Sequence, residues 1–310
     1  MKIFKDMHIA LLKGGSGSER EISLKSGKEC SIAIKKNNIK VSEIDFNKSI
    51  VDELIRLKPD VCFNALHGHH GEDGNIQGLL NIFKIPYTHS GVMASSLAMN
   101  KIHFKNLITQ ATHSSKNPIR FPQTLDINEG STLSVKDYKG PYVIKPIEGG
   151  SSVGVSVIKD NKEAPLKQTY SNTNLMAEVL VGNKELTVTV LKDKPLCVTE
   201  IMATKDNHFY NYEAKYSDGG SIHETPASIP LVIAEQAMSW ALKAHQIIGC
   251  NGISRSDFRY DSNNSQLYML EINTQPGMTK TSLSPEQAAF CNIDMVEMVK
   301  ILIEEATYEC

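Results

Sequence analysis

The sequence predicts an α/β protein, with a helix-covered parallel sheet in the first hundred residues and an α+β part after it. In the first part, short apolar runs alternate with helical patterns, which is typical of βαβ units. The stretch SSKNPIRFPQT contains two prolines and many polar residues, so it predicts a domain boundary. Beyond this stretch, strand patterns dominate.

The first part begins with a predicted buried strand over residues 8–12 that ends at Gly14 and Gly15. Ser18 and Glu21 then fit a capping box in front of a helical pattern that continues to Ile34. The next predicted elements are strands at residues 41–46 and 60–66, a helix at 52–57 between them, and a helix near 95–110. Ligands of such sheets gather at the carboxyl ends of strands. The loops GGSGSERE (14–21) and LHGHHGEDG (66–74) occupy such ends.

The second part starts with a predicted strand in PYVIKP and another in VGVSVIKD, with a glycine- and serine-containing loop between them. Residues 203–230 show neither helical nor strand periodicity, and a loop of that length favours a functional lid or a disordered segment. Apolar spacing from Ile233 to Ile248 predicts an amphipathic helix closed by Gly249. A hairpin and a C-terminal helix complete the predicted order.

Composition excludes several classes of protein. The 310 residues include 33 Lys and Arg against 35 Asp and Glu, which gives a net charge of -2 and a pI near 6.6. Duplex-binding domains are usually strongly basic, so no nucleic-acid partner is expected. No apolar run approaches the roughly 20 residues of a membrane-spanning helix. The six cysteines show no zinc-site spacing, and we expect reduced thiols in a soluble, cytoplasmic protein.

A predicted hairpin formed by RSDFRY and QLYMLEIN has the composition of a metal site. Alternation places Arg255, Asp257 and Arg259 on one face of the first strand. The same rule places Leu267, Met269, Glu271 and Asn273 together on the second strand. Centring the turn near residue 264 sets Asp257 opposite Glu271 and Arg255 opposite Asn273. Facing carboxylates repel unless a cation such as Mg²⁺ lies between them. Alternatively, the two arginines merely balance the acids on an exposed hairpin.

The loop in KPIEGGSSVG has the composition of a phosphate-binding loop. Alternation places Lys145 on the strand face opposite Ile144. The glycines let backbone amides approach phosphate oxygens, and the serines add donors. Neither a Walker A motif nor G-x-G-x-x-G occurs in the sequence. A plain tight hairpin remains the alternative for this loop taken alone.

The motifs together resemble the D-alanine–D-alanine ligase family of the ATP-grasp superfamily. The matching stretches span the whole chain in the family's order and spacing: GGSGSERE, ALHGHHGEDG, SGVMASSLAMNK, VIKPIEGGSSVG, FYNYEAKY, RSDF and LEINTQPGMTKTSL. The resemblance implies a Rossmann-like parallel-sheet domain at residues 1–100. A two-domain ATP-grasp fold would follow, with a central subdomain at 101–182 and a C-terminal subdomain at 183–310.

The resemblance also implies a reaction. ATP would phosphorylate the carboxylate of one D-alanine, and the amine of a second D-alanine would attack the acyl phosphate, for peptidoglycan synthesis. Glu19, Ser151 and Tyr216 would hold the first D-alanine, with His67 close by. Arg255 and the amide of Gly277 would stabilise negative charge on the intermediates. Ser282 and Leu283 would bind the second carboxylate. Helix capping is the alternative role for Glu19 and Ser282.

The resemblance assigns ATP and Mg²⁺ as cofactors, with two ions expected and Mn²⁺ able to substitute. The metal ligands would be Asp257, Glu271 and Asn273. The residues implied for ATP are Lys101, Lys145, Ser152 and Lys215 at the phosphates, Glu178 and Leu180 at the adenine, and Glu185 at the ribose. Lysines are ordinarily solvated surface charges, so the family pattern alone supports these assignments. A homodimer is a further expectation from the family.

Some positions depart from the family pattern: Asn100, Val179, the loop residues 147–149, and Thr281. They bear on adenine and phosphate contacts rather than on the reaction class. Within LHGHHGEDG the residue spacing does not favour metal ligation by the histidines. Glu72 and Asp73 are interpreted as orienting neighbours or capping a helix near Asn75.

Three alternative functions remain open from the sequence. The second substrate could be D-lactate or D-serine, although Tyr216 in EAKY resembles the dipeptide-forming type. The chain could also be another ATP-grasp carboxylate–amine ligase, or a nucleotide-binding protein without activity. The last is disfavoured because Glu19, Arg255 and Ser282 are all present.

Overall fold

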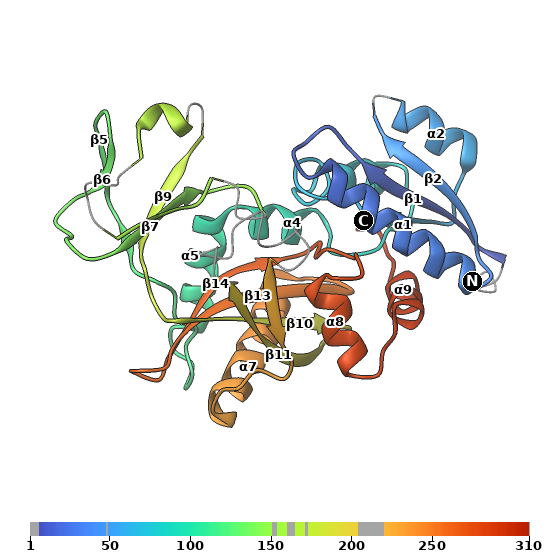
Figure 1. The fold of residues 1–310 in the computed structure, drawn as a ribbon. Helices are drawn as coiled ribbons and strands as arrows, with labels where there is room; N and C mark the ends of the chain where they lie inside the picture. Colours follow the sequence, from blue (N-terminus) through green and yellow to red (C-terminus); the bar gives the residue numbers. More distant parts are fainter. Residues whose placement is uncertain are drawn as a thin grey trace.

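The computed structural model describes residues 6–47, 49–150, 154–159, 165–170, 173–203 and 220–309. Figure 1 shows a parallel sheet with helices at the N-terminal end, a small antiparallel sheet, and a larger antiparallel sheet between them. The predicted mixed α/β class is therefore confirmed. The proposed boundaries after residues 100 and 182 stay a prediction.

The N-terminal sheet has the strand order β2-β1-β3, and all pairs are parallel. Its strands are β1 (His8–Gly14), β2 (Lys40–Phe46) and β3 (Val61–Asn64), with helices α1 (Arg20–Lys36), α2 (Ile50–Leu57) and α3 (Asn75–Ile82). Ile9 and Leu11 belong to one buried cluster, whereas Ala10 and Leu12 belong to another. Helices therefore cover both faces, which explains why the β1 sequence is apolar without alternation.

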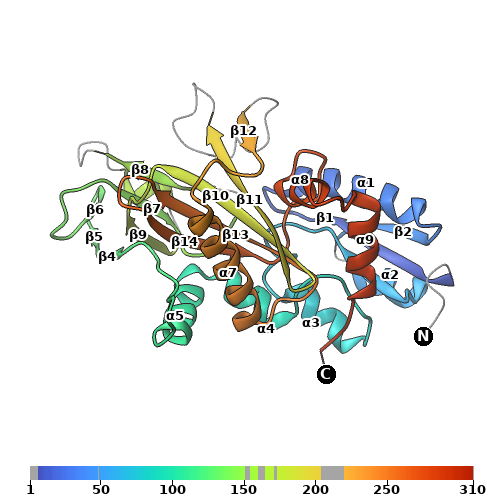
Figure 2. The ribbon, with the colours of Figure 1, turned by 90° about the horizontal axis from the view of Figure 1, so that it is seen from below.

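The C-terminal helices lie against this N-terminal sheet, which the sequence did not predict. They are α8 (Leu283–Phe290) and α9 (Met295–Glu304). Met298 and Leu302 of α9 share a buried cluster with Ile9 and Leu11, and the two views in Figures 1 and 2 place α9 beside α1. The sequence predicts a single C-terminal helix, whereas the structure has two. The break falls at residues 291–294, where Asp294 caps α9 by accepting a hydrogen bond from the amide of Glu297.

Two other predicted helix features are wrong. The capping box of Ser18 and Glu21 does not form, because α1 begins at Arg20 and Glu19 occupies the N-cap position without a side-chain cap bond. The helix predicted near 95–110 is two helices, α4 (Val92–Met99) and α5 (Lys101–Thr112). Asn100 separates them in an extended conformation, and its side chain accepts a hydrogen bond from the amide of His103. Asn favours such caps over helix interiors.

The small sheet has the antiparallel order β4-β9-β7-β8. Its strands are β4 (Thr124–Leu125), β9 (Leu175–Val179), β7 (Tyr142–Pro146) and β8 (Ser156–Ile158). The same part of the chain forms a two-stranded ribbon, β5 (Ile127–Glu129) and β6 (Leu133–Val135), and the 3-10 helix η3 (Lys167–Tyr170). The predicted alternation in β7 is confirmed: Ile144 is in the core of this sheet, and Lys145 lines a cleft on the other face.

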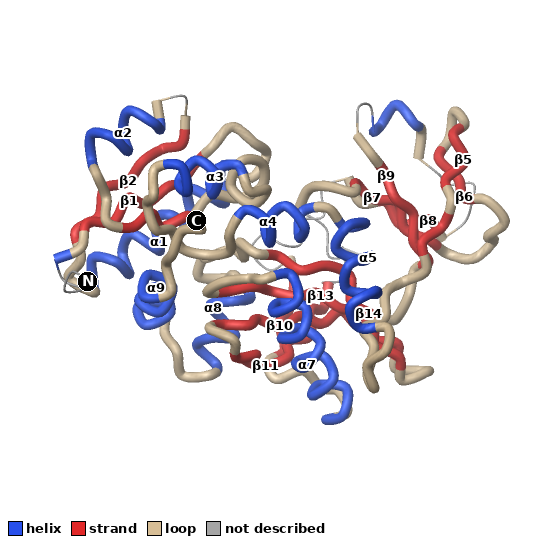
Figure 3. The backbone as a smooth tube through the Cα atoms, turned by 180° about the vertical axis from the view of Figure 1, so that it is seen from behind, coloured by secondary structure: helices blue, strands red, loops and turns tan. Residues whose placement is uncertain are grey.

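The large sheet has the order β12-β11-β10-β13-β14. Its strands are β12 (Ser221–Glu224), β11 (Lys194–Ala203), β10 (Lys184–Leu191), β13 (Ile253–Asp261) and β14 (Gln266–Asn273). Helix α7 (Leu231–Ile248) ends at Gly249 with φ 74°, as predicted. Figure 3 shows α4, α5 and α7 on the same side of this sheet. Trp240 of α7, Phe104 of α5 and Phe258 of β13 meet in its core.

Strand β12 corrects the prediction for residues 203–230. Residues 221–224 pair with β11, although their own burial alternates only between half-buried and exposed. The partner strand rather than an apolar pattern therefore specifies this strand. Residues 204–219 of the predicted loop lie outside the described residues.

The structure bears on two further compositional predictions. Among the described cysteines, Cys30, Cys62 and Cys197 are buried and all are unpaired. Burial raises the pKa of the Cys62 thiol to about 12, which makes it inert. No helix within the described ranges is long and apolar enough to cross a membrane.

Buried His89 makes folding stability sensitive to pH. Burial, with the nearby His67 ring, lowers the pKa of His89 from 6.5 to about 3. The unfolded chain therefore binds a proton that the folded chain does not, and stability falls as pH drops below about 6.5. Between pH 7 and 5 this costs about 2 kcal/mol. Urea unfolding at several pH values gives the free energy of unfolding for wild type and for His89→Gln. Between pH 7 and 5 this free energy should fall by about 2 kcal/mol more in wild type than in the variant. An equal fall in both proteins would contradict the prediction.

Candidate active site

Two adjoining clefts meet where the three sheets come together. The first, here the sheet cleft, is an open space of about 870 Å³ between β7 and β9 on one side and β13 and β14 on the other. The second, here the loop cleft, is lined by the loops after β1, β3 and β14 and by the start of α8. Gly150 and Glu271 line both clefts. The clefts therefore form one continuous site.

The hairpin of β13 and β14 carries the predicted metal ligands in the predicted register. Asp257 pairs with Glu271, and Arg255 pairs with Asn273. Arg255, Asp257 and Arg259 all line the site, so the shared face predicted for them is confirmed.

The face predicted for β14 is wrong because of a β-bulge. Register shifts between Asp257 and Phe258, so that Phe258 pairs with Met269 and Leu270 is the extra residue. Leu267 and Met269 consequently point into the helix-covered core, whereas Glu271 and Asn273 line the clefts. An extra residue reverses the alternation of side chains beyond it. Bulges are common beside active sites for this reason.

Each of the two facing carboxylates is paired with a basic side chain. Arg255 donates two hydrogen bonds to Asp257, from Nε to Oδ1 at 2.9 Å and from Nη2 to Oδ2 at 2.8 Å. Thr187 of β10 donates to the same Oδ1 at 2.7 Å. The Lys101 ammonium lies 3.5 Å from Glu271 and donates to the carbonyl of Gly149 at 2.7 Å. Asp257 is only 8% exposed and Glu271 is half-buried, so the two acids do not belong to an exposed hairpin.

Glu178 lies between two lysines at the wall of the sheet cleft. Its oxygens are 2.6 Å from Lys145 and 2.8 Å from Lys105. Burial alone would raise the pKa of Glu178, but the charges of Lys145 and Lys105 outweigh burial and hold that pKa below its ordinary value. Lys105 also donates to the carbonyl of Pro122 and, at 2.7 Å, to the hydroxyl of Thr124. Sequence inspection missed Lys105, because a lysine four residues beyond Lys101 on a helix reads as a surface charge.

The remaining wall of the sheet cleft includes Leu180 and Glu185, which the family resemblance assigns to the nucleotide. Arg259 Nη1 lies 3.4 Å from Glu185 Oε2. Arg259 also donates to the carbonyls of Val181 and Gly182. The turn between β9 and β10 and the start of β10 are thereby held against β13.

The loop cleft brings together Glu19, His67 and Glu72. The Nε2 atom of His67 is 2.9 Å from the hydroxyl of Ser26, and Nδ1 is 3.2 Å from Glu72. A Cβ atom at Gly68 would lie 2.2 Å from the Glu19 carboxylate, and the backbone there has φ +67°. A side chain at this position would be strained by the backbone conformation and would displace the Glu19 carboxylate. Glu72 orients His67, as one of the interpretations of the loop expected.

The far wall of the loop cleft contains Gly277, Ser282 and Leu283. Ser282 occupies the N-cap position of α8 but makes no cap bond. Its hydroxyl instead accepts a hydrogen bond from the amide of Thr279 at 3.0 Å. The simple capping alternative for Ser282 therefore does not account for its side chain.

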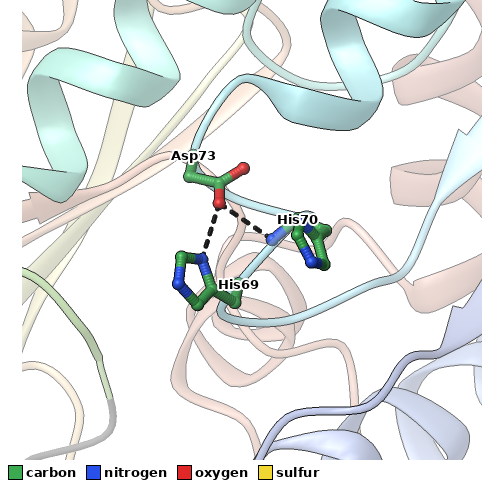
Figure 4. Close-up of side chains that lie close together, drawn as sticks. All are labelled: His69, His70 and Asp73. Atoms are coloured by element: carbon green, nitrogen blue, oxygen red, sulfur yellow. Dashed lines mark hydrogen bonds and ion pairs between the residues drawn. The ribbon is translucent and has the colours of Figure 1, made fainter.

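Figure 4 shows a group of His69, His70 and Asp73 in the loop after β3. Both imidazoles are exposed. The Asp73 carboxylate lies 2.9 Å from His69 Nδ1, accepts the amide hydrogen of His70 at 2.9 Å, and accepts that of Asn75 at 3.1 Å. These bonds within the loop account for the group, in keeping with the role expected for Asp73.

Four predicted site residues, Ser151, Ser152, Lys215 and Tyr216, lie outside the described residues. All other predicted site residues line one of the two clefts.

Comparison with known proteins decides the family. A family model described as D-ala D-ala ligase C-terminus matches residues 122–304, and one described as D-ala D-ala ligase N-terminus matches residues 45–90. The chain belongs to the D-alanine–D-alanine ligase family. The resemblance inferred from the motifs is confirmed.

Relatives of this ligase family match nearly end to end. The D-alanine–D-alanine ligase of Zymomonas mobilis is 44% identical over 311 residues, covering 97% of this chain and 94% of the relative. That of Methylobacterium radiotolerans is 42% identical over 308 residues, covering 97% and 98%. Among solved structures, the Bacillus anthracis ligase complexed with ATP has a TM-score of 0.78 at 24% identity and covers 96% of this chain and 97% of its own. That structural likeness shows that the chain shares the fold of the Bacillus anthracis protein.

Proposed function

We propose that the protein joins two D-alanines into D-alanyl-D-alanine at the expense of ATP, with D-alanyl phosphate as the intermediate and ADP and phosphate as products. One observation carries the proposal. The sheet cleft, which is lined by lysines, opens into the loop cleft through the shared residues Gly150 and Glu271. A phosphate donor in the first cleft would thereby meet a carboxylate in the second.

ATP would lie in the sheet cleft, with its phosphates near Lys101 and Lys145 and its adenine against the apolar wall around Leu180. Support comes from the mixture of apolar wall and paired cations and from the solved relative complexed with ATP. The Lys145–Glu178 pair keeps the ammonium directed at the cleft. We assign Glu178 to positioning lysines, because both of its oxygens are engaged by them.

Mg²⁺ fits the chemistry of the donor set formed by Asp257, Glu271 and Asn273. Two carboxylates and an amide oxygen converge at the end of one hairpin, and such hard oxygen ligands suit Mg²⁺ carrying nucleotide phosphates. The ion would neutralise phosphate charge during transfer. The proposal includes two Mg²⁺ ions, for which Mn²⁺ can substitute. Arg255 and Lys101 already balance these acids, so the residues are held in place for a cation.

The first D-alanine would bind in the loop cleft with its ammonium near Glu19 and its carboxylate toward Arg255. Attack of that carboxylate on the γ-phosphorus forms the acyl phosphate and releases ADP. The second D-alanine would place its carboxylate at Ser282 and the amide of Leu283, where the positive end of α8 favours an anion. Its deprotonated amine then attacks the acyl carbon. Arg255 and the Gly277 amide would stabilise the tetrahedral oxyanion, and phosphate leaves.

The experiment that tests the function is phosphate release with ATP, Mg²⁺ and D-alanine, repeated with L-alanine and with D-lactate or D-serine as co-substrate. We expect release and dipeptide with D-alanine alone. Preference for D-lactate or D-serine would establish the alternative second substrate. Release without any D-alanine requirement would contradict the proposal. A homodimer and a cytoplasmic location stay expectations from the family.

Removal of Lys105 should weaken ATP binding. In Lys105→Met, Glu178 keeps only Lys145 and competes more strongly with phosphate for it, so the KM for ATP should rise about tenfold, or about 1.4 kcal/mol, while kcat changes less. Lys116→Met removes an exposed lysine near the same helix and should leave the KM unchanged. An unaltered KM in Lys105→Met would show that the second lysine has no role in nucleotide binding.

A further inference from the structure

Buried Gln275 connects the two loops that form the loop cleft. It lies in the turn after β14, between Asn273 and Gly277, and is only 1% exposed. Its side-chain amide donates to the backbone carbonyl of Asn64 at 2.5 Å, and its side-chain oxygen accepts a hydrogen bond from the side-chain Nδ2 of Asn64 at 3.3 Å. Asn64 ends β3 and is also 1% exposed. Two residues 211 positions apart are thus joined by a two-bond amide clamp inside the protein.

The clamp reaches both groups of predicted site residues. The side-chain amide of Asn64 also donates to the backbone carbonyl of Gly71 at 2.9 Å, within the loop that carries His67 and Glu72. On the other side, the backbone amide of Gln275 donates to Oδ1 of Asn273 at 2.8 Å. That bond directs the oxygen rather than the nitrogen of the Asn273 amide toward the Gln275 backbone, and a carbonyl oxygen retains a second lone pair. An amide oxygen that accepts one hydrogen bond can still coordinate a cation through this second lone pair.

We propose that Gln275 is a positioning residue that fixes Asn273 as a metal ligand by clamping its turn to Asn64. The inference rests on the proposed function, because it takes Asn273 as a ligand of Mg²⁺. Buried amides strongly favour a partnered arrangement, so the turn has one low-energy position relative to β3. Removal of the clamp would free the backbone amide that orients Asn273 without removing any ligand.

The chain offers a matched control in Gln77 of α3. Gln77 is 2% exposed, and its side-chain amide donates to the same carbonyl of Gly71 at 2.9 Å. Gln77→Leu therefore removes a buried glutamine bond to the same loop without touching the turn at 273–277. Both substitutions should lower thermal stability, whereas only loss of Gln275 should affect the metal.

The test measures Mn²⁺ binding to the ADP-bound protein by the EPR signal of free Mn²⁺. Gln275→Leu is expected to raise the dissociation constant for Mn²⁺ about tenfold, and metal-free ADP binding should stay within twofold. Gln77→Leu should leave the Mn²⁺ constant within twofold. Gln275→Met is a second variant for the case that Gln275→Leu does not fold. It is expected to raise the Mn²⁺ dissociation constant by the same factor.

The outcomes separate the two proposals. Wild-type Mn²⁺ affinity in the Gln275 variants, or an equal loss in Gln77→Leu, would overturn the positioning role while leaving the metal site in place. Absence of Mn²⁺ uptake by the wild-type protein would overturn the metal assignment itself, and the role of Gln275 with it.

Discussion

Conversion of Asp257 to Asn together with Glu271 to Gln is expected to abolish turnover, by at least about a thousandfold, while the fold stays intact. The two residues face each other across the β13–β14 pair, and the amides keep their shapes but remove both negative charges. A cation carrying nucleotide phosphates then loses most of its attraction to the hairpin. Dipeptide formation measures the loss, and circular dichroism checks the fold.

A control on the same hairpin distinguishes a metal site from general damage. Asp261 lies at the turn end of β13, where its carboxylate accepts hydrogen bonds within the exposed turn. Asp261→Asn is the same chemical change outside the clefts and should retain full turnover. Undiminished activity in the Asp257 and Glu271 double variant would show that the hairpin does not hold the metal.

Arg255→Lys is expected to lower kcat by about 10²–10³-fold, equivalent to about 3–4 kcal/mol of transition-state stabilisation. The substitution keeps a positive charge but loses the planar fork, which now makes two bonds to Asp257. A single ammonium cannot hold Asp257 and an oxyanion in the same geometry. Steady-state kinetics at saturating ATP and D-alanine measure the effect.

Arg120→Lys provides the matched comparison for Arg255. The Arg120 side chain donates to Gln266 at the far end of β14 and lies outside both clefts, so its kcat should be unchanged. A kcat within threefold of wild type in Arg255→Lys would mean that charge alone suffices at this position. The oxyanion role assigned to the guanidinium fork would then be wrong.

The sequence predicted the site better than it predicted local geometry. The pairing of Asp257 with Glu271 followed from counting outward from the turn, but the bulge at Leu270 could not be read from that count, because it depends on how the hairpin packs against α4, α5 and α7. Counting from the turn gives the correct strand pairs on the side of the bulge away from the turn, where the site lies. The faces of Leu267 and Met269 were mistaken for the same reason.

Contacts between segments that are distant in the sequence were the other feature that the sequence did not predict. Lys105 reaches Glu178 across 73 residues, and Gln275 reaches Asn64 across 211. Neither residue has a local pattern that distinguishes it from a surface lysine or a turn glutamine. Only burial and the partner identify them, and both arise from the packing of elements that are separate in the sequence.

The most direct test of the proposed reaction follows the carboxylate oxygens of the first D-alanine. D-Alanine labelled with ¹⁸O in its carboxylate is turned over with unlabelled ATP and Mg²⁺ in unlabelled water, and the released phosphate is analysed by mass spectrometry. Formation of D-alanyl phosphate predicts one ¹⁸O atom in each phosphate and one ¹⁸O in the peptide carbonyl. Dipeptide formed with unlabelled phosphate would contradict the acyl phosphate route and the site arrangement inferred from it.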